Sequence, residues 1–288
     1  MEEMKLTVYT LAIGDYSDCL GRALESVKSA DEIVVQCGDD EKTREIAKKY
    51  TDKVFTDYKW NDDGGEARNH VIKKCTGDWI LELDCDNWLE EGGIEKIKKI
   101  IDMSHHDVLS VTLSNFPHHH NLPLLFKNDP KYFYVGSVHE ILNTPAKAGS
   151  NITIYEGVST KRNNDPGRNL RRLKAALDKN PDLVREKFYY GREYYDSKYY
   201  YNAIYWLDKY LQKATWLPEK AEAYYYKALS LWKTSQGELA RQSCLMAIEI
   251  NANMKKALEL MAEMSWPKNR ERWLDFAKHA TNEGVVFA

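Results

Sequence analysis

The chain has 288 residues, enough for two ordinary hydrophobic cores and more than a single core usually fills. Its 43% hydrophobic and 30% charged residues are typical of a globular protein, and a formal net charge of -3 gives no global attraction to nucleic acid or an anionic membrane. The apolar runs are only as long as strands, well short of the ~18 residues of a membrane span. These properties argue against a membrane-spanning protein and a generally basic nucleic-acid-binding protein.

The cysteines are widely spaced, contain no C-x-x-C pair and follow no secretory signal. This pattern predicts reduced thiols and a cytoplasmic protein. The five positions are Cys19, Cys37, Cys75, Cys85 and Cys244.

The first part of the chain alternates short apolar runs with polar helical segments, which predicts βαβ crossovers, a mainly parallel sheet and an α/β fold. Ligands of such sheets collect at the carboxyl ends of the strands. The expected strands are Leu6–Ile13, Glu32–Gln36, Val54–Thr56 and Trp79–Leu83, and the expected helices are Cys19–Ser29, Glu41–Tyr50, Gly65–Cys75 and Ile94–Met103.

After residue 103 the pattern changes to strand-like runs. We expect them to extend the same sheet, some in antiparallel orientation, but the pattern does not fix their order. They are Val108–Ser114, Leu122–Lys127, Tyr132–Leu142 and Ile152–Val158.

From Asn169 onward only helical periodicity is present. Small residues recur at intervals that let paired helices approach closely, as in tetratricopeptide repeats. We therefore divide the chain into an α/β domain at residues 1–160 and an all-α, tetratricopeptide-like domain at 161–288. The small residues are Gly191, Ala203, Ala228, Ala240, Ala247 and Ala262.

Two other features of the helical half have a structural and a functional interpretation. Its abundant aromatic residues, from Tyr189 to Trp206, are more typical of helix packing than of a concave binding face. The basic connector over Lys161–Arg172 is more typical of a solvated helix start than of a phosphate-binding patch.

The sharpest chemical feature is a pair of carboxylates, Asp84 and Asp86, that follow the apolar strand Trp79–Leu83. Hard oxygen ligands at this edge suit Mg²⁺ or Mn²⁺ bridged to a diphosphate. The triplet alone is weak evidence, because carboxylates at strand ends also cap helices and fill turns.

Its context makes the pattern specific, because the chain resembles glycosyltransferase family 2, in the branch whose catalytic domain precedes tetratricopeptide-like helices. The likeness covers roughly residues 5 to 160 and extends through Tyr189–Tyr194 and Tyr205–Tyr210. Four segments carry it: Asp31–Val35 with Gly38 and Thr43, Trp60–Asn69, Gly77–Asp86, and Gly136–Glu140.

The resemblance implies a GT-A fold and inverting transfer of a sugar from a nucleotide-sugar donor, with Mn²⁺ or Mg²⁺ as cofactor. It assigns the metal to Asp84, Asp86 and His139, and the catalytic base to Glu140. Donor-binding positions are Thr10, Ala12, Gln36, Asp40, Asp63, Arg68, Asp84 and Cys85, with Arg68 on the diphosphate side.

The chain departs from the family at the nucleotide-base pocket. Gln36 stands where the family usually has an acidic residue, and Asp39-Asp40-Glu41 replaces its Ser-Thr-Asp run. An amide can still recognise a base, so UDP is the favoured nucleotide by assumption.

Three interpretations from ordinary structure stand beside these assignments. Arg68 could form a surface ion pair with Glu66 or Asp62. His139 could be a buried histidine beside a surface glutamate, Glu140. The run His118–His120 is expected on a solvated loop rather than at a metal site.

Two other functions compete with a glycosyltransferase. A nucleotidyltransferase would also place a metal at a strand end, but Ile13-Gly14-Asp15 is not a basic, glycine-rich phosphate loop. A catalytically inactive, peptide-binding scaffold is the other alternative. For the enzyme, the expected acceptor is a peptide, a glycan or a lipid-linked glycan; nucleic acid is not favoured, and the helical domain offers a surface for a homo-oligomer.

Overall fold

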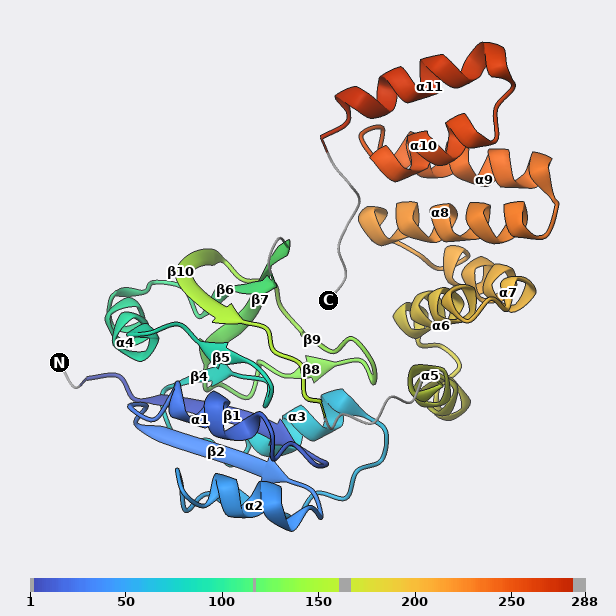
Figure 1. Ribbon diagram of the computed structural model, residues 1–288. Coiled ribbons are helices and arrows are strands. Elements are labelled where there is room, and N and C mark those ends of the chain that lie inside the picture. Colours follow the sequence, from blue (N-terminus) through green and yellow to red (C-terminus); the bar gives the residue numbers. More distant parts are fainter. Residues whose placement is uncertain (1–2, 116–117, 161–166, 282–288) are drawn as a thin grey trace. The chain divides into compact units, whose positions relative to one another are not determined.

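The computed structural model describes residues 3–115, 118–160 and 167–281. It divides into two compact units, Met1–Asp165 and Pro166–Ala288, which we describe separately (Figure 1). The boundary predicted at residue 160 lies just before a segment, 161–166, outside the described residues, and the first half of the basic connector lies there too.

The first unit contains an eight-stranded sheet in the order β3-β2-β1-β4-β7-β6-β10-β5. Parallel pairing joins β3, β2, β1 and β4 as well as β6 and β10, and the other neighbours are antiparallel, which confirms a mixed, mainly parallel sheet. The strands are β1 Leu6–Ala12, β2 Glu32–Cys37, β3 Val54–Phe55, β4 Trp79–Glu82, β5 Trp88–Leu89, β6 Val108–Asn115, β7 His118–Lys127 and β10 Ala148–Tyr155.

Helices and a hairpin cover the two faces of this sheet. Apolar residues of α1 (Leu20–Glu25), α2 (Glu41–Ala47) and α4 (Gly93–Met103) share one buried core with the sheet. On the other face, α3 (Gly64–Ile72) and the segment around Tyr134 pack against Tyr9, Val34 and Ile80. Side chains alternate along a strand, so β1, β2, β4, β6 and β7 each contribute to both cores.

The hairpin corrects one sequence prediction. Residues 132–142 do not form one strand of the main sheet, because β8 (Tyr134–Val135) and β9 (Ile141–Leu142) pair with each other as a separate two-stranded sheet. Positive φ angles at Gly136 (97°) and His139 (54°) turn the backbone between them, which no continuous strand allows.

The histidine run also differs from expectation. His118–His120 opens strand β7 and pairs with Ser114 and Leu113 of β6, so the expected solvated loop is wrong there. The short strand β5 was not predicted, because two residues are too few to show alternation.

The second unit is entirely helical in its described part, and consecutive helices pack against each other. The predicted small residues are buried at these contacts; a Cβ added to Gly191 would lie 2.7 Å from Leu207 Cγ. Close helix approach therefore explains their recurrence. The helices are α5 Arg168–Lys179, α6 Val184–Asp196, α7 Tyr200–Leu211, α8 Leu217–Lys233, α9 Gly237–Ile250, α10 Lys255–Glu263 and α11 Pro267–His279.

The tyrosines of this unit differ in burial. Tyr189, Tyr190 and Tyr210 are buried between helices, whereas Tyr199 and Tyr201 are mostly exposed. The packing interpretation is confirmed for the buried tyrosines. Within the described residues, no helix has both the length and the apolar character needed to cross a bilayer.

Candidate active site

The site is built where strand β4 leaves the sheet. Trp79 and Leu81 belong to the core on the α1 side, and Ile80 belongs to the core on the α3 side. Alternation therefore turns Glu82 toward α3, and Asp84 follows on the same side. Cys85 lies in the opposite core, only 5% exposed, which sends its side chain away from Asp84.

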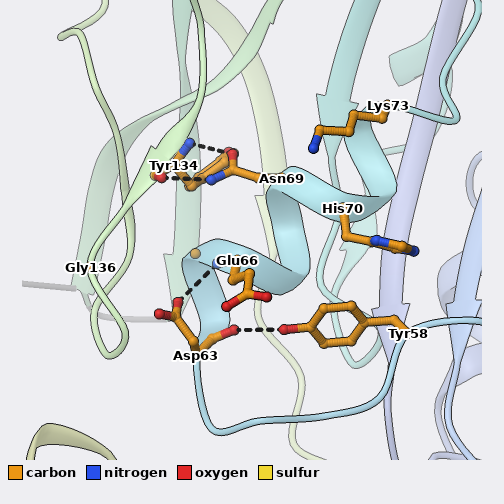
Figure 2. A pocket seen from close by; sticks show the side chains of 9 residues that line it. Tyr58, Asp63, Glu66, Asn69, His70, Lys73, Tyr134 and Gly136 are labelled. Atoms are coloured by element: carbon orange, nitrogen blue, oxygen red, sulfur yellow. Dashed lines mark hydrogen bonds between the residues drawn. The ribbon is translucent and has the colours of Figure 1, made fainter. Parts of the chain in front are cut away.

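Helix α3 is anchored at its first turn. Asp63 is its N-cap, and its Oδ1 accepts from the backbone N–H of Glu66 at 2.9 Å (Figure 2). The backbone N–H groups of Gly64 and Gly65 donate to the carbonyl oxygens of Ser137 and Gly136, both at 3.1 Å. Helix N–H groups that would otherwise lack partners thus fasten the loop that carries Glu140.

A glycine is required at position 65 for this contact. A Cβ on Gly65 would lie 2.5 Å from the carbonyl oxygen of Gly136, so a side chain there would push the loop away. Further along α3, Asn69 exchanges two hydrogen bonds with the backbone of Tyr134, at 2.7 and 2.8 Å (Figure 2). The order of residues in the Gly-Gly-Glu-Ala-Arg-Asn segment therefore fixes the hairpin against the sheet.

Arg68 joins three carboxylates. Its Nε lies 2.6 Å from Glu82 Oε1, its Nη2 3.3 Å from Asp84 Oδ1 and its Nη1 3.5 Å from Glu140 Oε2. The structure thus brings together three residues proposed from the sequence, Arg68, Asp84 and Glu140, which come from helix α3, the end of β4 and the hairpin loop. The surface pair with Glu66 or Asp62 that ordinary packing would give is not the contact observed.

Negative charge dominates this cluster. Desolvation, followed by neighbouring carboxylates, raises the pKa of Asp84 to about 6, although the Arg68 guanidinium acts in the opposite direction. The side chain is still 53% exposed. Glu82, Asp86 and Glu140 lie near Asp84, so the negative charge of the cluster exceeds the single positive charge of Arg68 and favours binding of a further cation.

The backbone around Asp86 is held by contacts with Arg22 and Gly157. Arg22 donates to the carbonyl oxygen of Asp86 at 3.3 Å and lies over the Trp88 ring at 3.8 Å. The Gly157 N–H donates to Asn87 Oδ1 at 3.1 Å, and a Cβ at Gly157 would lie 2.0 Å from the Asp86 carbonyl oxygen. The loop is therefore held by α1 and by the end of β10.

The metal assignment has partial support from this geometry. The donors are hard oxygens in a negatively charged cluster, which suits Mn²⁺ or Mg²⁺. Across the described ranges, however, no three His, Cys, Asp or Glu side chains are already gathered in a metal-binding arrangement. Asp84, Asp86 and His139 would have to adjust around an ion, so their metal role stays a prediction.

The predicted base-binding residues are not gathered in one place. Thr10 and Ala12 are buried on the α1 side, whereas Gln36 is fully buried on the α3 side, where its Nε2 donates to the Phe55 carbonyl oxygen at 3.1 Å. The Asp40 side chain caps helix α2, accepting from the Thr43 N–H at 2.8 Å. Their part in nucleotide recognition stays a prediction.

A cavity of about 340 Å³ lies on the other side of α3 (Figure 2). Glu66, His70 and Lys73 line it from one helix face, and a rotation of 100° per residue puts Arg68 on the opposite face. Asp63, Gly136 and Tyr134 also border it, but Asp84 and Asp86 do not. The cavity therefore adjoins the carboxylate cluster through Tyr134, which donates to Glu82, but none of the clustered carboxylates lines it.

Sequence reasoning missed Glu82 and Tyr134. Glu82 is 5% exposed, and its second carboxylate oxygen accepts a hydrogen bond from the Tyr134 hydroxyl. A signal existed, because an acidic residue inside an otherwise apolar strand requires a buried partner.

Part of this chain is similar to a known protein family. Residues 14–153 match the family model described as "Glycosyl transferase family 2". A TPR repeat-containing protein of Synechococcus elongatus is 31% identical over 140 residues, which is 46% of this chain and 34% of that protein. Glycosyltransferase SunS of Bacillus phage SPbeta is 26% identical over 152 residues, or 48% of this chain and 36% of its own length.

The matches to these curated relatives span about a third of their length. Among solved structures, S. aureus TarS is similar over 90% of this chain and 55% of its own, with 15% identity and a TM-score of 0.44. MamA is similar over 38% of this chain and 61% of its own, with 22% identity and a TM-score of 0.32.

Proposed function

From a chain that carries a glycosyl transferase family 2 domain at residues 14–153, we propose an inverting, metal-dependent glycosyltransferase. The donor is a nucleotide-sugar, with UDP as the expected nucleotide, and the acceptor is a peptide, a glycan or a lipid-linked glycan. The observation that best supports this proposal is the convergence of Arg68, Asp84 and Glu140 where β4 ends.

The residues divide the work as follows. Asp84, Asp86 and His139 would hold Mn²⁺ or Mg²⁺, which when bound offsets the charge of the departing diphosphate. Arg68 presents two Nη groups to the same region, where a planar guanidinium matches phosphate oxygens.

Glu140 takes the acceptor proton. As the acceptor oxygen or sulfur forms its bond to the anomeric carbon, the bond from that carbon to the diphosphate oxygen breaks and the electron pair leaves with the nucleotide. Glu140 is 13% exposed and lies 3.5 Å from Arg68, so the proposed base and the proposed diphosphate ligand are neighbours.

A mutation of Asp86 tests the proposal. Asp86→Ala should abolish release of UDP from a donor identified by a thermal-shift screen of nucleotide-sugars with Mn²⁺, while the Tm stays nearly unchanged. Asp52→Ala, an exposed carboxylate outside the site, is the matched control. Wild-type turnover by Asp86→Ala would contradict the metal role.

A second mutation separates donor binding from transfer. Glu140→Gln should bind the donor with Mn²⁺ as the wild type does but lose transfer to acceptor, because only proton removal is affected. Unchanged transfer would place the base elsewhere.

One observation favours the non-enzymatic alternative, a peptide-binding scaffold. Gln36 is fully buried and its amide nitrogen donates to backbone carbonyl oxygens, so this position presents no base-recognising group at the surface. The same thermal-shift screen decides between the two functions, since a scaffold would bind no nucleotide-sugar.

The domain roles and self-association are also proposals. We place donor binding and catalysis in residues 1–160 and acceptor presentation in the tetratricopeptide-like residues 161–288, with a homo-oligomer forming through the helical unit. A cytoplasmic location is a further proposal, supported by the spacing of the cysteines.

A further inference from the structure

We propose that Glu82 and Tyr134 form a positioning pair that orients Arg68 for the proposed reaction. The inference rests on the proposed function for its consequence, but its geometric part stands separately. Neither residue is assigned a contact with donor, acceptor or metal. Both act through the Arg68 guanidinium, whose orientation decides which of its N–H groups face Asp84 and Glu140.

The contacts of Arg68 differ in strength. The contact from Nε to Glu82 is short, at 2.6 Å, and Glu82 is almost completely buried. The contacts from Nη2 to Asp84 and from Nη1 to Glu140 are longer, at 3.3 and 3.5 Å. A buried carboxylate must keep its partner, so Glu82 is the fixed contact and the other two are exchangeable.

Fixing Nε also fixes the two Nη groups. The guanidinium is planar, and its N–H donors point in set directions, so an anchor at Nε leaves little freedom for the rest. Arg68 then spans the carboxylate at the end of β4 and the carboxylate on the hairpin loop. A lysine has a single ammonium nitrogen, so it could not contact Glu82, Asp84 and Glu140 through separate nitrogens held in fixed directions.

Tyr134 completes a closed ring of contacts. Its hydroxyl donates to the second oxygen of Glu82, and its backbone is held by Asn69 of α3, the helix that also carries Arg68. Burial raises the pKa of Tyr134 well above the usual 10, which keeps the hydroxyl protonated and able to donate. The path from α3 through Tyr134 and Glu82 returns to α3.

The geometric part is tested by hydrogen exchange of the Arg68 Nε–H, followed by NMR on the full chain. Arg68→Lys assigns the signal. Tyr134→Phe should accelerate its exchange by about tenfold, because Glu82 loses the hydroxyl that holds it. Tyr132→Phe is the matched control, since it removes a hydrogen bond to Asp107 from the same region. An exchange rate unchanged by Tyr134→Phe overturns the proposal.

The functional part uses a double-mutant cycle on donor turnover. Tyr134→Phe should lower kcat by about tenfold with a smaller effect on the donor KM, and it should have no further effect in an Arg68→Lys background. Equal losses in both backgrounds would show that Tyr134 does not act through Arg68.

Glu82→Gln provides an independent variant with the same expectation for the exchange rate and for the cycle. If the wild-type chain turns over no nucleotide-sugar at all, the proposed function fails, and the exchange of the Arg68 Nε–H still decides whether Glu82 and Tyr134 position it.

Discussion

The two units rely on different kinds of contact. In the α/β unit, polar side chains join segments far apart in the sequence, as when Glu82, Arg68 and Glu140 meet. In the helical unit, small residues let each helix lie close to the next, as Gly191 does beside Leu207. Polar contacts between distant segments position the side chains of the candidate site, whereas repeated packing of neighbouring helices forms an extended surface. A mutation should therefore spread its effect in the first unit and stay local in the second.

Leu207→Ala should have the largest effect on stability. The side chain is fully buried against Gly191, and removal of such a leucine costs about 2–5 kcal/mol. Hydrogen exchange measured by mass spectrometry should become faster in α6, α7 and α8 and should not change in the sheet. Leu217→Ala, at a residue 59% exposed, is the control. Faster exchange throughout the sheet would break the contrast between the units.

Glu32 should give a pH-dependent contribution in the α/β unit. Desolvation acts to raise the pKa of the Glu32 carboxyl group, but hydrogen bonds from Lys53, Thr7 and Thr76 outweigh it. The pKa is therefore lowered from 4.5 to about 2. Because the folded pKa is the lower one, this stabilisation is present above about pH 4.5 and is lost as the pH falls toward 2.

The measurement compares urea unfolding of wild type and Glu32→Gln. The variant should be less stable by about 3 kcal/mol near neutral pH, and the difference should shrink toward pH 2. Glu45→Gln, on the exposed side of α2, controls for loss of a surface charge. If the difference in unfolding free energy did not depend on pH, ionisation of Glu32 would not contribute to stability.

Gly65→Ala should combine a moderate loss of stability with loss of function. The added methyl group meets the Gly136 carbonyl oxygen, and such overpacking costs about 1–3 kcal/mol. Because the displaced loop carries Glu140, donor turnover should fall further than stability alone explains. Gly21→Ala is the control, since its Cβ would lie 3.7 Å from Ile46. Normal turnover by Gly65→Ala would detach the loop from catalysis.

Tyr201→Ser should have the smallest effect. This tyrosine is 71% exposed, so its removal should change the unfolding free energy by less than about 0.5 kcal/mol. Loss of acceptor transfer at unchanged stability would identify the exposed tyrosines as a binding surface. A large loss of stability would return them to the packing role that the sequence favoured.

Much of this architecture could be predicted from periodicity. Alternation and helical spacing locate β1, β2, β4 and the helices α1 to α4 within a few residues, because each element buries an apolar face. Periodicity failed at residues 132–142, where left-handed backbone at Gly136 and His139 breaks an otherwise strand-like run. Pairing between distant strands, such as β6 with β10, leaves no local mark in the sequence.

Only part of the site could be predicted from the sequence. Asp84, Arg68 and Glu140 could be named because a family pattern fixes their order, and the structure brings them together. Their partner Glu82 could not be named by pattern, since only its burial reveals that it needs Arg68. The N-cap roles of Asp40 and Asp63 show how a carboxylate that matches a binding motif also serves its own helix.

Gly157 links the Asp86 loop to the last described residues of the α/β unit. A Cβ on Gly157 would lie 2.0 Å from the Asp86 carbonyl oxygen, and Ser159 and Thr160, two and three residues later, form hydrogen bonds of 2.6–2.8 Å to Asp18. A ligand that displaced the Asp86 backbone would therefore also move the segment from Gly157 to Thr160. Binding at Asp86 would in that way be transmitted mechanically along the chain to residues 159 and 160, the last described residues of the first unit.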